Sequence, residues 1–288
     1  MTGNDGHRRG FRGFRDQKQN KQGNKNEKPK FDESNPVLVN FKKYAQELDA
    51  KHDRYERIVK FGRDVTIESK RIIFLLHTID PKKENKENVL NEAEKRLLTL
   101  CEVNFLNIAK ELGHLDPYQY ARAYSPGLQE FVEAFTFYEY LSGRKMSDWK
   151  CLQEKLNYQV KSENEGEAED PKDIKEVSCL VQPVEFILGL ADTSGEVMRK
   201  CINSLGSGDI DSCFESCRIM QSLYASFLSI GFCRNRELSR KIYTLHQSVL
   251  KTENVCYNVK VRGGEAAKWG TVGDGFGEKN FENDEGFY

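Results

Sequence analysis

The sequence predicts an all-α protein built from seven helices. Apolar residues recur at steps of three and four along most of the chain, and prolines and glycines separate these periodic segments. No alternating apolar and polar run flanked by turns competes with this pattern. With 288 residues, the chain is long enough to bury a core without covalent support. The eight cysteines lie within apolar helical patterns, which indicates free thiols in a reducing compartment.

The first predicted helix covers residues 36–79. Ser34 and Asn35 provide a cap and Pro36 suits a first helical turn, and apolar residues then follow at helical spacing as far as Leu76. Such a helix is about 66 Å long. Because a compact domain does not need a helix of that length, we expect a long bundle whose helices also pack against neighbouring chains.

Six further helices are predicted between residues that end or begin helices. They cover residues 88–113, 117–143, 147–159, 182–205, 210–231 and 235–262. The breaks between them are Asp80-Pro81, Gly113, Gly143, an acidic loop at about residues 160–177 with Pro171, the segment Gly206–Asp209, and Gly231.

The helical domain, residues 34–262, lies between two segments of different composition. Residues 1–33 form a basic arm, which is predicted to be disordered because its first 30 residues hold nine Lys or Arg against three Asp or Glu and few apolar residues. Residues 263–288 form a glycine-rich acidic tail, which is predicted to be flexible. The arm is interpreted either as a contact to RNA or a nuclear import signal, or as a solvated tail.

The sequence predicts neither a membrane-spanning protein nor a secreted one. The longest apolar run, Ile72–Leu76, is far shorter than the roughly 20 residues of a membrane span. The arginine-rich N-terminal segment has no apolar stretch typical of a secretion signal.

Two pairs of acidic residues are the candidate site. Glu130 and Glu133 are three positions apart and share a helix face, and no Lys or Arg occurs between residues 123 and 143. Asp192 and Glu196 are four positions apart, and no Lys or Arg occurs between residues 180 and 198. Glu130, Glu133 and Asp192 therefore lack the salt-bridge partners that solvated helical carboxylates usually have on their own helix.

Carboxylates in apolar surroundings either take up a proton or bind a cation. A site made only of carboxylates suits Mg²⁺ or Mn²⁺ rather than zinc or copper, and with substrate phosphate it could support phosphodiester hydrolysis. Gly189 and Gly195, inside the second acidic helix, indicate close approach of another helix or of a ligand. The spacing alone leaves open that these acids face solvent or a partner chain.

Two other groups are interpreted as structural. Cys213 and Cys217 share a helix face, but no second Cys or His pair follows at ligand spacing, which favours core packing. His77 has no evident nucleophile partner and is also interpreted as structural.

Several sequence motifs resemble those of the translin-associated factor X (TRAX) group of the translin family. They are ELDAKHDRYER at 47–57, GLQEFVEA at 127–134, GLADTSGEVMR at 189–199, CIN at 201–203, GDID at 208–211 and VKVRG at 259–263. The resemblance extends in order over about residues 36–263. It implies a translin-like bundle that assembles with translin into a hetero-octamer.

The resemblance further implies the catalytic subunit of a Mg²⁺-dependent endoribonuclease that cleaves single-stranded RNA and helps activate the RNA-induced silencing complex by removing the passenger strand. Cytoplasmic and nuclear localisation is expected. The family's catalytic and metal-binding acids correspond to Glu130, Glu133 and Asp192, with Glu196 as the nearby fourth carboxylate. Arg199 is expected either to contact RNA phosphate or to form a salt bridge with Glu196.

Two alternatives follow from the charge pattern. One is a non-catalytic scaffold that binds and localises translin and holds RNA electrostatically. The other is a DNA-binding factor that uses the basic arm.

Overall fold

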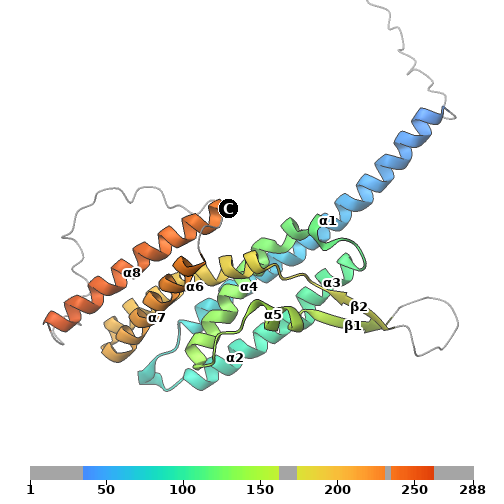
Figure 1. Ribbon diagram of the computed structural model, residues 1–288. Helices are drawn as coiled ribbons and strands as arrows, with labels where there is room; N and C mark the ends of the chain where they lie inside the picture. Colours follow the sequence, from blue (N-terminus) through green and yellow to red (C-terminus); the bar gives the residue numbers. More distant parts are fainter. Residues whose placement is uncertain (1–34, 162–173, 231–234, 263–288) are drawn as a thin grey trace, which may run out of the picture. The chain divides into compact units, whose positions relative to one another are not determined.

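The computed structural model describes residues 35–161, 174–230 and 235–262, and it confirms the all-α fold (Figure 1). Its helices are α1 (Pro36–Leu76), α2 (Lys86–Thr99), α3 (Leu106–Leu112), α4 (Ala121–Ser142), α5 (Trp149–Lys155), α6 (Pro183–Ser207), α7 (Ile210–Ser229) and α8 (Arg236–Arg262). A π-helical segment, Leu100–Phe105, joins α2 to α3, and together these three correspond to the single predicted helix 88–113. The eight helices of the described residues therefore correspond to the seven predicted ones. None of these helices is long and apolar enough to cross a membrane.

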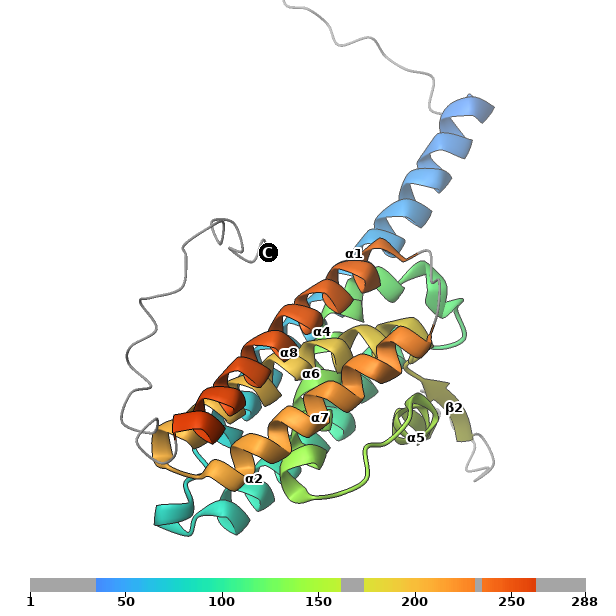
Figure 2. The same cartoon turned by 60° about the vertical axis from the view of Figure 1, so that its left-hand side comes forward.

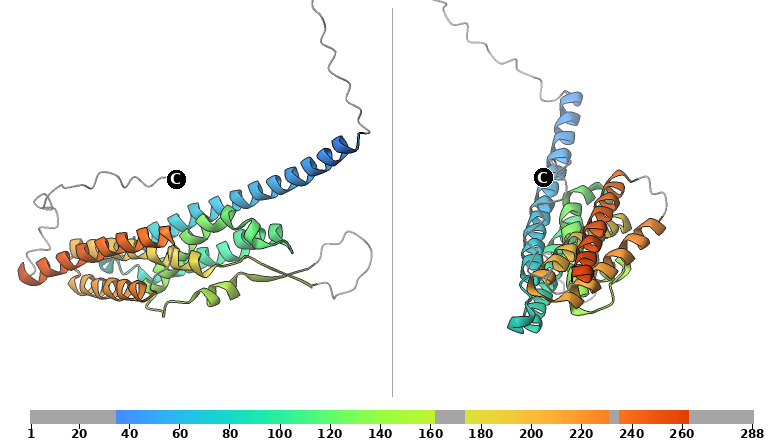
Figure 3. Two further views of the ribbon diagram at one scale, coloured as in Figure 1. Left: turned by 45° about the horizontal axis from the view of Figure 1, so that its top comes forward. Right: turned by 90° about the vertical axis from the view of Figure 1, so that its left-hand side faces the viewer.

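A short β-hairpin is the one regular element that the sequence interpretation did not expect. Strand β1 (Asn157–Lys161) pairs antiparallel with β2 (Ile174–Ser178), and the two strands are drawn as arrows in Figure 3. In their register Tyr158 lies opposite Val177. The predicted helix 147–159 is therefore wrong at its end, because α5 stops at Lys155 and the next residues pair with β2. The acidic loop is correspondingly shorter than 160–177.

Three predicted segments fall wholly or mainly outside the described residues. These are the basic arm, the middle of the acidic loop at residues 162–173, and the acidic tail. Their predicted disorder and flexibility remain predictions.

The chain divides into two compact units, Met1–Leu48 and Asp49–Tyr288. The described part of the first unit is the beginning of α1, with Phe41 and Tyr44 in edge-to-face contact at a ring-centroid distance of 6.4 Å. All other elements belong to the second unit, which also contains the candidate site.

Helix α6 is the central helix of the second unit. It packs against α4, α7 and α8, and α7 and α8 also pack against each other (Figure 2). This arrangement places the two acid-bearing helices, α4 and α6, side by side.

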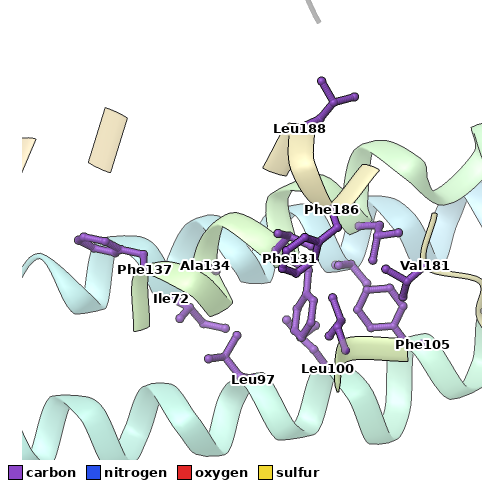
Figure 4. Close-up of a cluster of buried hydrophobic side chains, with 14 of the residues drawn as sticks. Ile72, Leu97, Leu100, Phe105, Phe131, Ala134, Phe137, Val181, Phe186 and Leu188 are labelled. Atoms are coloured by element: carbon purple, nitrogen blue, oxygen red, sulfur yellow. The ribbon is translucent and has the colours of Figure 1, made fainter. Parts of the chain in front are cut away.

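The main hydrophobic core ties α4 to the helices around it. Ile72 of α1, Leu97 of α2, Phe131 of α4 and Phe186 of α6 are all buried in it (Figure 4). Phe131 meets Phe105 edge to face, with ring centroids 5.0 Å apart. Because burial of each such side chain contributes roughly 1.5–3 kcal/mol, the core holds the backbone of α4 firmly beside α6.

Candidate metal centre

The two predicted acid pairs lie on neighbouring helices that are in tight contact. A β-carbon on Gly189 of α6 would lie 2.6 Å from the carbonyl oxygen of Gln129 and 2.7 Å from the β-carbon of Val132, both on α4. One turn further along, the buried hydroxyl oxygens of Thr136 and Thr193 lie 2.6 Å apart in a hydrogen bond between the helices. These two contacts bracket Glu130 and Glu133 along α4 and Asp192 along α6, whereas Glu196 lies three positions beyond Thr193.

Glu133 has the most strongly shifted carboxyl group of the candidate site. Burial, followed by the negative charges of Asp192, Glu130 and Glu196, raises its pKa to about 8, against an opposing effect of Lys241. The Glu133 carbonyl oxygen accepts a hydrogen bond from Thr136 Oγ1 at 3.4 Å, but within the described residues no hydrogen bond or ion pair involves the Glu133 side chain. The negative charges of acids on both helices therefore repel an ionised Glu133. Without a bound cation, this repulsion and the burial favour the protonated form of its carboxyl group.

Glu130 and Asp192 are shifted in the same direction for the same main reason. Burial raises the pKa of each carboxyl, and a lysine opposes the shift in each case, Lys70 at Glu130 and Lys241 at Asp192. Both groups are half-buried, which explains why desolvation outweighs their ion pairs.

Three of the four acids have cationic partners, and the sequence interpretation missed those of Glu130 and Asp192. Lys70 Nζ of α1 lies 3.3 Å from Glu130 Oε1, and Lys241 Nζ of α8 lies 2.6 Å from Asp192 Oδ2. Neither Glu130 nor Asp192 has a Lys or Arg partner on its own helix, as the sequence indicated, but their lysine partners come from other helices. The expectation that these two carboxylates must take up a proton or bind a metal ion because they lack partners is therefore wrong.

Glu196, the buried fourth acid, is held by His77 and Arg199. His77 Nε2 at the end of α1 forms a hydrogen bond with Glu196 Oε2, and the His77 ring packs against Phe137 with centroids 4.9 Å apart. Arg199 Nη1 lies 3.4 Å from the same oxygen, which is the salt-bridge alternative predicted for this arginine. His77 is thus in contact with the site, and its position at a helix end gave no sign of this in the sequence.

Lys241 connects both acid-bearing helices. Besides Asp192, its ammonium group donates to Gln129 Oε1 at 3.0 Å and to the carbonyl oxygen of Leu188 at 3.3 Å. Gln129 in turn donates to Glu185 Oε2 at 2.6 Å. A single cation on α8 therefore holds together groups from α4 and α6.

The four candidate side chains offer only carboxylate oxygens as ligands, which suits a hard divalent ion. Carboxylate oxygens are the ligands that Mg²⁺ and Mn²⁺ prefer. Within the described residues, no three acids have ligand oxygens that all lie within 4.8 Å of one another. Ion binding at these four acids would therefore draw the carboxylates together and displace the lysine contacts.

Gly189 and Gly195 offer a matched test of packing beside the acids. Gly189→Ala is expected to lower the free energy of unfolding by about 1–3 kcal/mol, because its new methyl group would overlap α4. Gly195→Ala is expected to raise it by up to about 1 kcal/mol, because nothing lies within 4 Å of a β-carbon there and alanine favours helix. Urea unfolding of both variants measures the difference. Equal shifts of the same sign would contradict the tight contact at Gly189.

Comparison with known proteins places the chain in a family. The Translin family profile matches residues 53–263. Translin-associated protein X of Mus musculus is 41% identical over 240 residues, which cover 82% of each chain. The Translin-associated protein X homolog of Schizosaccharomyces pombe is 24% identical over 235 residues, which cover 78% of this chain and 87% of that protein.

Two solved structures share the fold. The crystal structure of apo-NeC3PO has a TM-score of 0.55 and 21% identity, and the match covers 82% of this chain and 98% of that one. The structure of the AfC3PO–duplex RNA complex has a TM-score of 0.55 and 22% identity, covering 79% and 98%. At these identities the likeness concerns the fold alone. Together with the family profile and the 41% identical relative, it confirms the resemblance seen in the sequence motifs, and the chain belongs to the translin family.

Proposed function

We propose that this chain is the catalytic subunit of a translin-family endoribonuclease that hydrolyses single-stranded RNA with Mg²⁺, or with Mn²⁺ in its place. The observation that carries the proposal is the pairing of two acid-bearing helices around Glu133, a shielded carboxyl group without a cationic partner among the described residues. The motif resemblance supports the reaction type. The RNA in one of the related solved structures supports the class of ligand.

In this proposal Glu130, Glu133 and Asp192 hold the ion, and Glu196 is a further ligand or the base for the attacking water. A bound divalent ion supplies Lewis-acid activation of water and stabilises the leaving oxygen. His77 orients the Glu196 carboxylate through its Nε2 contact and keeps one oxygen, Oε2, in a fixed position. Because His77 and Arg199 both contact Oε2, the other oxygen of the Glu196 carboxylate would accept the proton of the attacking water.

The cations around the acids have a second role in the proposal. Lys70 and Lys241, which pair with Glu130 and Asp192, would contact phosphate oxygens of RNA if an ion replaced them at these carboxylates. Arg199 is half-exposed beside Glu196 and would supply a third contact of this kind.

We also propose that the chain acts together with translin in a hetero-octamer, in the cytoplasm and the nucleus, and that it helps activate the RNA-induced silencing complex. Exposed apolar side chains on α8, among them Tyr243, Tyr257 and Val261, support burial of this helix against a partner. The family membership supports translin as that partner.

Metal dependence tests the proposal directly. Cleavage of single-stranded RNA by the chain assembled with translin is expected to stop in EDTA and to return with Mg²⁺ or Mn²⁺, because the carboxylates then regain their ion. RNA retention on a filter should persist in EDTA. Cleavage that continues in chelator would contradict the role of a divalent ion.

The alternative, a scaffold that binds translin and holds RNA by charge, is favoured by the lysine partners of Glu130 and Asp192, which already balance two of the acids. It predicts RNA binding that weakens with salt, ignores EDTA and is never accompanied by cleavage. The same assay therefore separates the two functions.

A further inference from the structure

A second cluster of potential metal ligands lies away from the acids, where α6, α7 and α8 pack together. Cys201 Sγ of α6 is 3.2 Å from Cys213 Sγ of α7, and Cys213 Sγ is 3.7 Å from Cys256 Sγ of α8. All three sulfur atoms lie within 4.8 Å of one another, the only such group of three or more Cys, His, Asp or Glu ligands in the described parts of the chain. Cys217 belongs to the same buried cluster.

Cys213 and Cys217 are buried in a hydrophobic cluster, as core packing predicts, but further thiols lie nearby that the sequence interpretation did not find. These thiols come from other helices, so no spacing within one segment could have indicated them. Cys201 and Cys213 are fully buried, and Cys217 and Cys256 are nearly so. Leu205, Phe214 and Val255 pack around the cluster and shield it.

The sulfur separations are close to those of a thiolate metal site. In a tetrahedral zinc site with bonds of about 2.3 Å, sulfur atoms lie about 3.8 Å apart. The two distances here, 3.2 Å and 3.7 Å, differ from this value by little more than half an ångström at most. A small outward movement of Cys201 and Cys213 would make room for the ion.

The position of Cys213 on its helix also favours a thiolate. Cys213 lies in the first turn of α7, where the helix dipole stabilises negative charge, against the opposing charge of the N-cap residue Asp209. Because a buried free cysteine also packs as a small hydrophobic residue, the meeting of three thiols from three helices, rather than their burial, indicates a ligand site.

We propose that Cys201, Cys213 and Cys256 bind a zinc ion, and that Cys217, which belongs to the same buried cluster but lies outside the group of three sulfur atoms, moves toward the ion as the fourth ligand. Such an ion would fasten α6, which carries Asp192 and Glu196, to α7 and α8. Its role is structural, because the buried thiols leave no open position for substrate. The proposal stands independently of the RNA-cleaving function.

Cobalt substitution tests this site. The full chain, prepared with reductant, is expected to contain about one zinc per chain by elemental analysis. After removal of zinc, Co²⁺ should give the intense near-ultraviolet absorption of thiolate-bound cobalt, and one equivalent of Zn²⁺ should abolish it. A folded chain that contains no zinc and develops no such absorption would overturn the proposal.

Matched variants assign the signal to the cluster. Cys213→Ser and Cys256→Ser are expected to lose the cobalt absorption, whereas Cys151→Ser, at an exposed cysteine of α5, should retain it. Asp192→Asn should also retain it, since oxygen ligands give no thiolate band. If the cluster variants do not fold, the titration of the unaltered chain decides. A disulfide between any two of these cysteines in the protein as purified, seen as a mass lower by two hydrogens, would count against zinc.

Discussion

Asp192→Asn and Glu133→Gln are each expected to lower the rate of single-stranded RNA cleavage by roughly a hundredfold or more, while RNA binding and assembly with translin persist. A catalytic divalent ion contributes several kcal/mol to transition-state stabilisation, and about 1.4 kcal/mol corresponds to tenfold in rate. Both substitutions preserve side-chain size but remove one negative charge from the group of acids that would hold the ion. The measurement is single-turnover cleavage at saturating protein.

The controls for this experiment are the same substitutions at exposed positions. Asp211→Asn on α7 and Glu154→Gln on α5 change the net charge equally but lie at solvent-exposed positions. They should cleave RNA at the unaltered rate. Full activity in both Asp192→Asn and Glu133→Gln would remove these carboxylates from the catalytic site.

The helices could be predicted because their signals are local. Pro36, Asp116 and Pro183 lie at helix starts, and Gly113, Gly143 and Gly208 directly follow helix ends, as expected from backbone geometry at helix termini. The β-hairpin could not be predicted in this way. Tyr158 becomes a strand residue because it pairs with Val177, beyond an acidic segment whose composition indicates only a loop.

The candidate site was predictable in part, because the signal of each acid pair is also local. A spacing of three or four positions places two acids on one helix face, so each pair could be identified by itself. That the pairs meet depends on the contact between α4 and α6, and their cations come from further away. Lys241 is 49 positions from Asp192 and His77 is 119 from Glu196, which no local pattern can connect. The glycine at 189 was the one sequence signal of the helix contact.

In the absence of metal, the protein is expected to lose stability as the pH rises from about 4.5 to about 8. The Glu133 carboxyl has an ordinary pKa of 4.5, which holds in the unfolded chain, and a pKa of about 8 in the folded chain. Between these values the folded state binds more protons than the unfolded state. The stabilisation is therefore complete below the lower value and is lost by up to about 1.4 kcal/mol per pH unit above it. Glu130 and Asp192 are shifted upward too and act in the same sense.

Urea unfolding in EDTA at several pH values measures this slope, and Glu133→Gln identifies its source. The amide cannot titrate, so the variant should show a shallower slope and exceed the unaltered chain in stability near the upper end of the range, because repulsion from Asp192 and Glu130 is relieved. Mg²⁺ or Mn²⁺ should stabilise the unaltered chain most at high pH, where ionised carboxylates bind the ion without first losing protons. Glu154→Gln serves as the control and should leave the slope unchanged. If Glu133→Gln also left it unchanged, Glu133 would not be the shielded carboxyl that holds its proton in the metal-free protein, and its place among the ion's ligands would lose its physical basis.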